Sequence, residues 1–219
     1  MLAFEEGLSL RERKQAKTKV LLAQEFLNSL KDTKYEDVPI RSICERAEVS
    51  EGTFYNYFPQ KADIFNYILT LYDAKSIMEA DEVVSRKDPI KWIEKFFGNI
   101  VGIMLSLGNM TNEIFAVILK ERFKPQKISI PHLEFLYMFP EMEGKGAMRD
   151  ISHEDCLEEI ANEAILKGLI KDTFTKRDMV TYLKSILGGL PFMRIVYKDE
   201  EIANIVSKQL LIFWNGVRK

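Results

Sequence analysis

The segment VSEGTFYNYFPQK, residues 49–61, decides the fold because it carries the start signals of one very short helix. Ser50 is a preferred N-cap residue, whose side chain accepts a hydrogen bond from the first helical turn. Val49 before it and Phe54 after it have the spacing of a hydrophobic staple. A helix is therefore predicted to begin at Glu51.

Four aromatic residues within positions 54–58 give this helix two different faces. Phe54 and Phe58 are four residues apart, so they share the face that is assigned to the core. The other face is predicted to point outward and to consist of Thr53, Tyr55, Asn56 and Tyr57. This outward surface is available to contact another molecule.

The preceding segment, PIRSICERAEV at residues 39–49, has the pattern of a second short helix. Pro39 suits a first helical turn, and the apolar face consists of Ile40, Ile43, Cys44 and Ala47. Two short helices joined by about three residues are typical of a helix-turn-helix motif. The second helix of that motif enters the DNA major groove, so the outward tyrosines are expected to contact the groove and the phosphates.

The longer segment SICERAEVSEGTFYNYFPQKADIF, residues 42–65, resembles the DNA-binding signature of the TetR family of transcriptional regulators. The resemblance covers about residues 10–70 and implies a three-helix DNA-binding head. It also implies a set of DNA-binding residues, namely Arg41, Ser50, Glu51, Gly52, Thr53, Tyr55, Asn56, Tyr57 and Lys61. By the same resemblance, Tyr57 and Lys61 hold backbone phosphates, and Glu51 and Gly52 lie nearest the base edges.

The chain departs from the family pattern at Lys34, at Pro39 and in the turn of the motif. The turn between the two helices usually has Gly where this chain has Glu48. A residue in the left-handed region is therefore expected there without the freedom of glycine.

Charge limits how the head binds DNA. The whole chain has a formal net charge of −2, and residues 1–70 contain ten Lys and Arg against eleven Asp and Glu. Any attraction to phosphates must come from a local patch. Residues 11–19 supply one candidate, with Arg11, Arg13, Lys14, Lys17 and Lys19 against Glu12 alone, although the same run also suits a solvated helix face.

The rest of the chain is predicted to be helical, because apolar residues recur at spacings of three and four throughout. Helices are expected near 9–31, 40–47, 51–57, 61–84, 89–107, 110–123, 132–138, 153–169, 176–196 and 200–217. The predicted fold is all-α, with a helix-turn-helix DNA-binding domain at 1–60. A larger helical effector-binding and dimerisation domain follows at 61–219.

Other functional classes find little support in the sequence. No nucleophile elbow, Gly-rich phosphate loop or Ser-x-x-Lys pair is present, so no enzyme and no cofactor are predicted. His153 and Cys156 lie one helical turn apart, but two ligands make a weak metal site, and none is predicted. The two cysteines, far apart in sequence, and the acidic N-terminus without a signal pattern favour a cytoplasmic protein without a disulfide framework.

Apolar stripes in the central helices are candidates for an effector pocket. The predicted pocket residues are Trp92, Phe96, Ile100, Met104, Phe115 and Leu119. The irregular segment 124–152, with Phe135, Tyr137, Met138 and Phe139, is expected to form the wall or mouth of that pocket. Such stripes also suit an ordinary core. If they do form a pocket, a hydrophobic or amphipathic small molecule is the expected ligand.

The last two predicted helices are apolar around much of their circumference. Their predicted dimer contacts are Leu187, Gly188, Leu190, Ile205, Leu210, Phe213 and Trp214. A helical hairpin from each subunit would then form a four-helix interface. The alternative is that these helices close the monomer core.

The sequence thus predicts a ligand-responsive regulator, a repressor, that binds a near-palindromic operator as a homodimer. The alternative is a helical interaction protein whose head no longer binds DNA, which the acidic residues Glu45, Glu48 and Glu51 around the motif favour.

Overall fold

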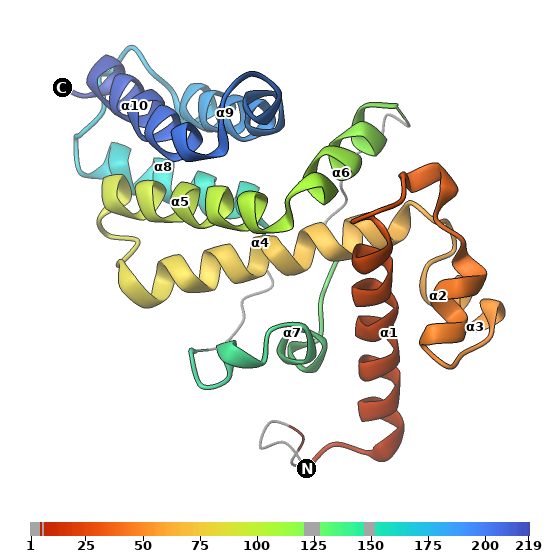
Figure 1. The fold of residues 1–219 in the computed structure, drawn as a ribbon. Coiled ribbons are helices and arrows are strands. Elements are labelled where there is room, and N and C mark those ends of the chain that lie inside the picture. Colours follow the sequence, from red (N-terminus) through yellow and green to blue (C-terminus); the bar gives the residue numbers. More distant parts are fainter. Residues whose placement is uncertain (1–4, 6, 121–127, 147–151) are drawn as a thin grey trace. The chain divides into compact units, whose positions relative to one another are not determined.

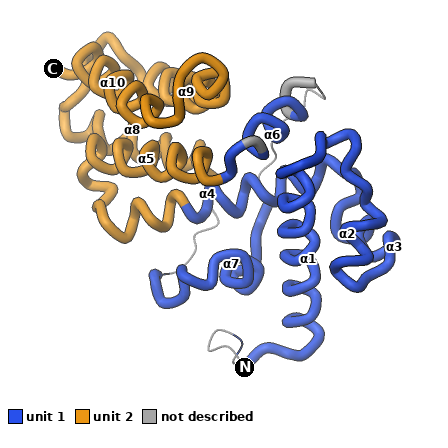
Figure 2. Tube along the Cα trace, viewed as in Figure 1, with its two compact units in different colours: residues 1–75, 107–150 blue, residues 76–106, 151–219 orange. Residues whose placement is uncertain are grey.

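The computed structural model describes residues 5, 7–120, 128–146 and 152–219, without the side chains of residues 109 and 118–120. All regular elements of this described part are helices, and one isolated antiparallel bridge joins Ile170 to Arg218 (Figure 1). The all-α prediction is confirmed. The chain divides into two compact units, residues 1–75 with 107–150 and residues 76–106 with 151–219 (Figure 2).

Unit 1 holds the helix-turn-helix segment. Its elements are α1 (Leu10–Ser29), η2 (Tyr35–Asp37), α2 (Ile40–Arg46), α3 (Glu51–Tyr57), the first part of α4 (Asp63–Val83), α6 (Asn109–Lys120), α7 (His132–Met138) and η3 (Pro140–Met142). The first helix begins with a capping box, because Ser9 accepts from the Glu12 amide while Glu12 accepts from the Ser9 amide.

The core of unit 1 is aromatic. The Phe26 ring of α1 meets the Phe65 ring of α4 edge-on at 5.3 Å, and Tyr35 lies 5.1 Å from Phe65. α1 also packs along α7, which lies far from it in sequence. The unit that contains the helix-turn-helix therefore extends beyond the predicted domain of residues 1–60, because α6 and α7 fold onto it.

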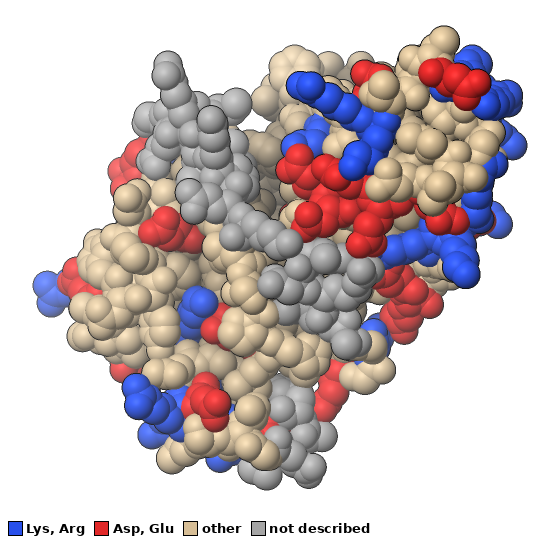
Figure 3. Space-filling model, turned by 180° about the vertical axis from the view of Figure 1, so that it is seen from behind, with Lys and Arg blue, Asp and Glu red and all other residues tan. Residues whose placement is uncertain are grey.

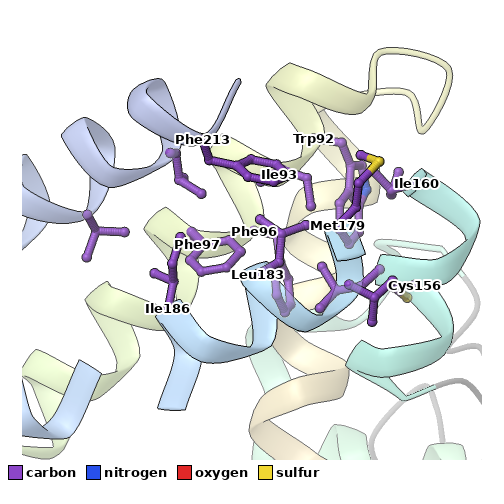
Figure 4. Packing of buried hydrophobic residues seen from close by; sticks show 14 of the residues in the cluster. Trp92, Ile93, Phe96, Phe97, Cys156, Ile160, Met179, Leu183, Ile186 and Phe213 are labelled. Atoms are coloured by element: carbon purple, nitrogen blue, oxygen red, sulfur yellow. The ribbon is translucent and has the colours of Figure 1, made fainter. Parts of the chain in front are cut away.

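Unit 2 consists of the rest of α4 together with α5 (Pro89–Leu107), α8 (His153–Leu166), α9 (Lys176–Val196) and α10 (Asp199–Val217). Capping boxes start α8 at Ser152 and α9 at Thr175. Figure 4 shows Trp92, Phe96 and Met179 pointing toward one another in the closed apolar core. Helices from distant parts of the sequence thus share one core.

A charged cluster closes one edge of this core. The guanidinium of Arg86 donates to both carboxylate oxygens of Asp81 and is also ion-paired with Glu159. It lies 5.3 Å from the centre of the Trp92 ring, whose indole N–H donates to Asp81 at 2.8 Å. Trp92 is fully buried, so its indole N–H needs this partner, whereas Asp81 and Glu159 stay exposed at the edge of the core.

Candidate nucleic-acid interface

The turn between α2 and α3 has the geometry of a helix C-cap. The Val49 amide donates to the Cys44 carbonyl at 2.9 Å, and the Glu48 amide donates to the Glu45 carbonyl at 3.2 Å. These two bonds form a Schellman motif, which places the residue after the cap in the left-handed region. Glu48 occupies that position with φ +56°, which confirms the sequence prediction.

The short helix α3 is fixed by its cap and by two aromatic anchors. The Ser50 hydroxyl accepts from the Thr53 amide at 3.1 Å. Phe54 is fully buried and Phe58 almost so, and their rings lie 5.5 Å apart. Phe58 also lies 5.5 Å from the Tyr67 ring of α4. This core face therefore sets the direction in which the opposite face of α3 points.

The opposite face of α3 is open to solvent. Glu51, Gly52 and Asn56 are exposed, and Tyr55 keeps 45% of its surface accessible. Thr53 and Tyr57 are half-buried. A short surface of amide, hydroxyl and phenol groups at the N-terminal end of a helix suits contacts with phosphates and base edges.

The other predicted contacts at the head have different surroundings. Arg41 is exposed at the start of α2, where its guanidinium is 3.0 Å from the Glu45 carboxylate. The Lys61 ammonium instead faces inward and donates to the carbonyls of Tyr35, Glu36 and Val38. It thereby ties the start of α4 to η2.

Some basic side chains of residues 11–19 are ion-paired and others are exposed to solvent. Arg13 lies 3.6 Å from the Glu5 carboxylate, and Lys19 lies 3.0 Å from that of Glu134. The exposed cations of the run are Arg11, Lys14 and Lys17. On the face drawn in Figure 3, basic and acidic side chains of the described residues are interspersed. The run therefore leaves three cations exposed to solvent, which limits the positive charge that α1 offers to phosphates.

A polar contact that the sequence did not reveal joins α7 to the head. Glu134 of α7 is 7% exposed, and its partner Lys19 also lies 4.4 Å from the centre of the Tyr67 ring. Burial and the negative charge of Glu134 raise the pKa of the Tyr67 phenol and, more weakly, the pKa of the Tyr57 phenol. The spacing of charges within one helix gives no signal for such a pair, because its members lie on α1 and α7.

Unit 1 also contains an open cleft of about 400 Å³. Its walls come from α1, α4, the segment around Leu107, α6 and α7, and its lining includes Met138 and Phe139 from the irregular segment. By contrast, the predicted pocket residues Trp92, Phe96 and Met104 are buried in the core of unit 2, with Ile100 packed against it.

The predicted pocket residues therefore do not come together in one unit. The Trp92 and Phe96 rings stack on each other with their centres 5.2 Å apart, so they fill the core of unit 2 and do not line a cavity. Phe115 is half-buried on α6 in unit 1. The side chain of Leu119 lies outside the described residues.

The predicted dimer residues fall into two groups. Leu190, Leu210, Phe213 and Trp214 are buried in the core of unit 2, whereas Leu187 and Ile205 are half-buried and Gly188 is exposed. A different apolar set is exposed on the same two helices, consisting of Phe192, Ile195, Val196, Leu211 and Ile212. Spacing alone did not separate the two faces, because both are apolar.

A match to a protein family covers the helix-turn-helix. The family model described as bacterial regulatory proteins of the tetR family matches residues 29–68, which span η2, α2, α3 and the start of α4. A search of the curated proteins finds no match.

Solved structures resemble the whole chain in fold. A transcriptional regulator of the TetR family from Agrobacterium tumefaciens aligns with a TM-score of 0.57 and 15% identity, covering 94% of this chain and 100% of its own. A structure described as the molecular basis for control of antibiotic production by bacterial hormones aligns at 0.58 and 13%, covering 96% and 100%. The TetR family protein CprB from S. coelicolor A3(2) aligns at 0.51 and 13%, covering 95% and 90%.

Proposed function

We propose, from this chain's membership of the TetR family of transcriptional regulators, that it is a cytoplasmic, ligand-responsive repressor. In this proposal it binds a near-palindromic operator as a homodimer. The observation that carries the DNA-binding step is the exposed face of α3, held outward by Phe54 and Phe58 on a capped turn. The expected partners are double-stranded operator DNA, a second copy of the chain and a small hydrophobic or amphipathic effector.

DNA contact is assigned to the exposed residues of the motif. Tyr55 and Asn56 supply groove contacts, and Glu51 and Gly52 lie at the end of α3 that enters the groove first. Thr53, Tyr57 and Ser50 border this surface, and Arg41 flanks it from the start of α2. Lys61 contributes by fixing η2 against α4, because its ammonium is engaged with backbone carbonyls.

Selection of binding sites from random duplex DNA tests this assignment. The full chain should enrich one sequence with approximate two-fold symmetry, with half-sites roughly 34–36 Å apart. Its affinity for that site should fall with rising salt, because neutralised phosphates release counterions. Failure to enrich any sequence, together with no affinity for bulk duplex DNA at low salt, would contradict the proposal.

The second candidate function is a helical interaction protein whose head no longer binds DNA. The observation that favours it is the exposure of Glu45, Glu48 and Glu51 around the motif, since carboxylates repel phosphates. The same salt titration separates the two functions. A protein of the second kind would show no salt-dependent affinity for any duplex.

The dimer is assigned to the exposed faces of α9 and α10. By length and composition, α9 is the one single helix in the described ranges that is apolar enough to cross a membrane, yet only 33% of that window is buried. Exposed Gly188, Phe192 and Ile195 recur at spacings of four and three, so they form one stripe on α9. A second copy of this hairpin would cover that stripe.

Gly188 gives the sharpest test of the interface. A Cβ built on it meets nothing within 4 Å, so nothing in the single chain requires glycine there. Gly in a helix interior costs about 1 kcal/mol relative to Ala. Gly188→Ala should therefore stabilise the isolated chain but weaken a dimer that needs close helix approach.

Sedimentation of the variants Gly188→Ala, Ile195→Glu and Leu166→Glu, beside the unaltered chain, tests this interface. The unaltered chain should sediment as a dimer at micromolar concentration, and Ile195→Glu as a monomer. Leu166→Glu is the matched control, because Leu166 is 83% exposed at the end of α8, outside the stripe. A dimer that survives Ile195→Glu would place the interface elsewhere.

A further inference from the structure

We infer that the cleft of unit 1 is the effector site, and that its ligand is an amphipathic small molecule with an anionic head group. The inference rests on the proposed ligand-responsive function and gives it a location and a chemistry. The cleft volume of about 400 Å³ lies within the usual range for small-molecule sites, roughly 300–1,000 Å³.

One wall of the cleft is the first helix of the DNA-binding head. Gln24, Asn28 and Lys31 line it from α1 and its C-terminal end. Their spacing of four and three residues places them on one face. Two amides and one ammonium supply hydrogen-bond donors to a ligand's polar end.

The opposite walls are apolar. Met110 of α6, Met138 of α7 and the ring of Phe139 line them, together with Tyr72 of α4. The Tyr72 and Phe139 rings lie 5.2 Å apart, so they form a continuous aromatic surface. Methionine side chains adapt to irregular ligand shapes because they are unbranched and flexible. These walls suit an apolar ring or chain.

The charges in the cleft favour an anion. The lining contains one carboxylate, Glu25, and one ammonium, Lys31. The Glu25 carboxylate already accepts from the Arg46 guanidinium at 2.5 Å, so its charge is compensated. Lys31 is exposed at the cleft and attracts a negatively charged head group. An amphipathic carboxylate or sulfonate meets both requirements.

Binding in this cleft acts directly on the DNA-binding unit. Glu25 and Asn28 belong to the same helix that packs on α2 and α3, and Arg46 at the end of α2 bonds to both Glu25 and Ser29. A ligand that shifts α1 therefore shifts the base of the helix-turn-helix. The size of the effect equals the ligand's differential affinity for the two arrangements.

Two fluorescent probes test the site in the unaltered full chain. 8-Anilinonaphthalene-1-sulfonate carries an anionic group, and N-phenyl-1-naphthylamine has the same rings without the charge. Gln24→Trp fills the cleft from its α1 wall and should weaken both probes at least about tenfold, a difference of 1.4 kcal/mol. Gln15→Trp is the matched control, because Gln15 is exposed on α1 outside the cleft lining.

The charge assignment has its own variant. Lys31→Gln should weaken the sulfonate probe several-fold and leave the uncharged probe within about twofold, as expected for loss of one exposed charge interaction. Equal loss of both probes would overturn the anionic head group. Unchanged binding of both probes by Gln24→Trp would overturn the cleft as the site.

The regulatory step is measured with DNA. Saturating sulfonate probe should lower the affinity of the unaltered chain for its selected duplex and should not lower that of Gln24→Trp. Unchanged affinity of the unaltered chain would overturn the cleft as an effector site. A chain that binds the probe in the cleft but binds no duplex would instead contradict the proposed DNA binding, so the two failures are distinguishable.

Discussion

The two units of this chain are both helical, but their cores and their exposed surfaces differ. Unit 1 has ion pairs and side-chain bonds to carbonyls, as at Glu134 and Lys61, around a core that contains a cluster of aromatic rings, and it leaves a cleft open. Unit 2 closes an apolar core completely and exposes a further apolar stripe on α9. The difference teaches that apolar stripes alone do not locate a ligand site, because in unit 2 they form a filled core.

The largest effect is expected in the core of unit 1. Phe58→Ala should lower the free energy of unfolding by about 3–5 kcal/mol, because Phe58 is 2% exposed and packs against the rings of Phe54 and Tyr67. Chemical denaturation measures the loss. A loss below about 1 kcal/mol would mean that α3 is not anchored by its core face.

Lys61 tests whether polar ties hold unit 1 together. Lys61→Met removes a cation from three backbone carbonyls and should cost about 2–3 kcal/mol of unfolding free energy. Lys14→Met is the control, since Lys14 is exposed on α1 and its loss should stay within about 0.5 kcal/mol. Equal stability of the two variants would mean that Lys61 does not hold η2 against α4 and is available to contact DNA phosphates.

The Lys19–Glu134 pair tests the contact between α1 and α7. Glu134→Gln should cost about 1–2 kcal/mol, less than a fully buried pair because 20% of the Lys19 side chain stays exposed. Glu45→Gln removes a carboxylate from the exposed pair with Arg41 and should change stability by less than about 0.5 kcal/mol. Comparable losses in both variants would contradict a special role for the α7 contact.

The fold was largely predictable, because local signals determine helix ends. Ser50 caps α3 as predicted, α8 and α9 begin at the predicted residues 153 and 176, and the left-handed Glu48 followed from its place in the turn. The inward direction of Lys61 was not predictable, because its acceptors lie far from it along the chain. The cleft was predicted only in part, at Met138 and Phe139, because its other walls come from elements distant in sequence.

A smaller and opposite effect is expected at the turn. Glu48→Gly should raise the free energy of unfolding by about 1 kcal/mol, because glycine adopts a φ of +56° without the penalty of a Cβ. Glu48→Ala removes the same carboxylate but keeps the Cβ, so it should not stabilise. Equal melting temperatures of the two variants would show that charge, not backbone conformation, limits this turn.

Tyr55 provides the most direct test of the central claim, that the exposed face of α3 recognises DNA. The measurement is the dissociation constant for the selected duplex, by fluorescence anisotropy, beside the melting temperature. Tyr55→Ala should weaken binding by at least about tenfold, or 1.4 kcal/mol, with the melting temperature nearly unchanged. Phe174→Ala, which removes an aromatic ring that is 36% exposed in unit 2, should bind as the unaltered chain does. Unaltered DNA affinity of Tyr55→Ala would contradict the claim.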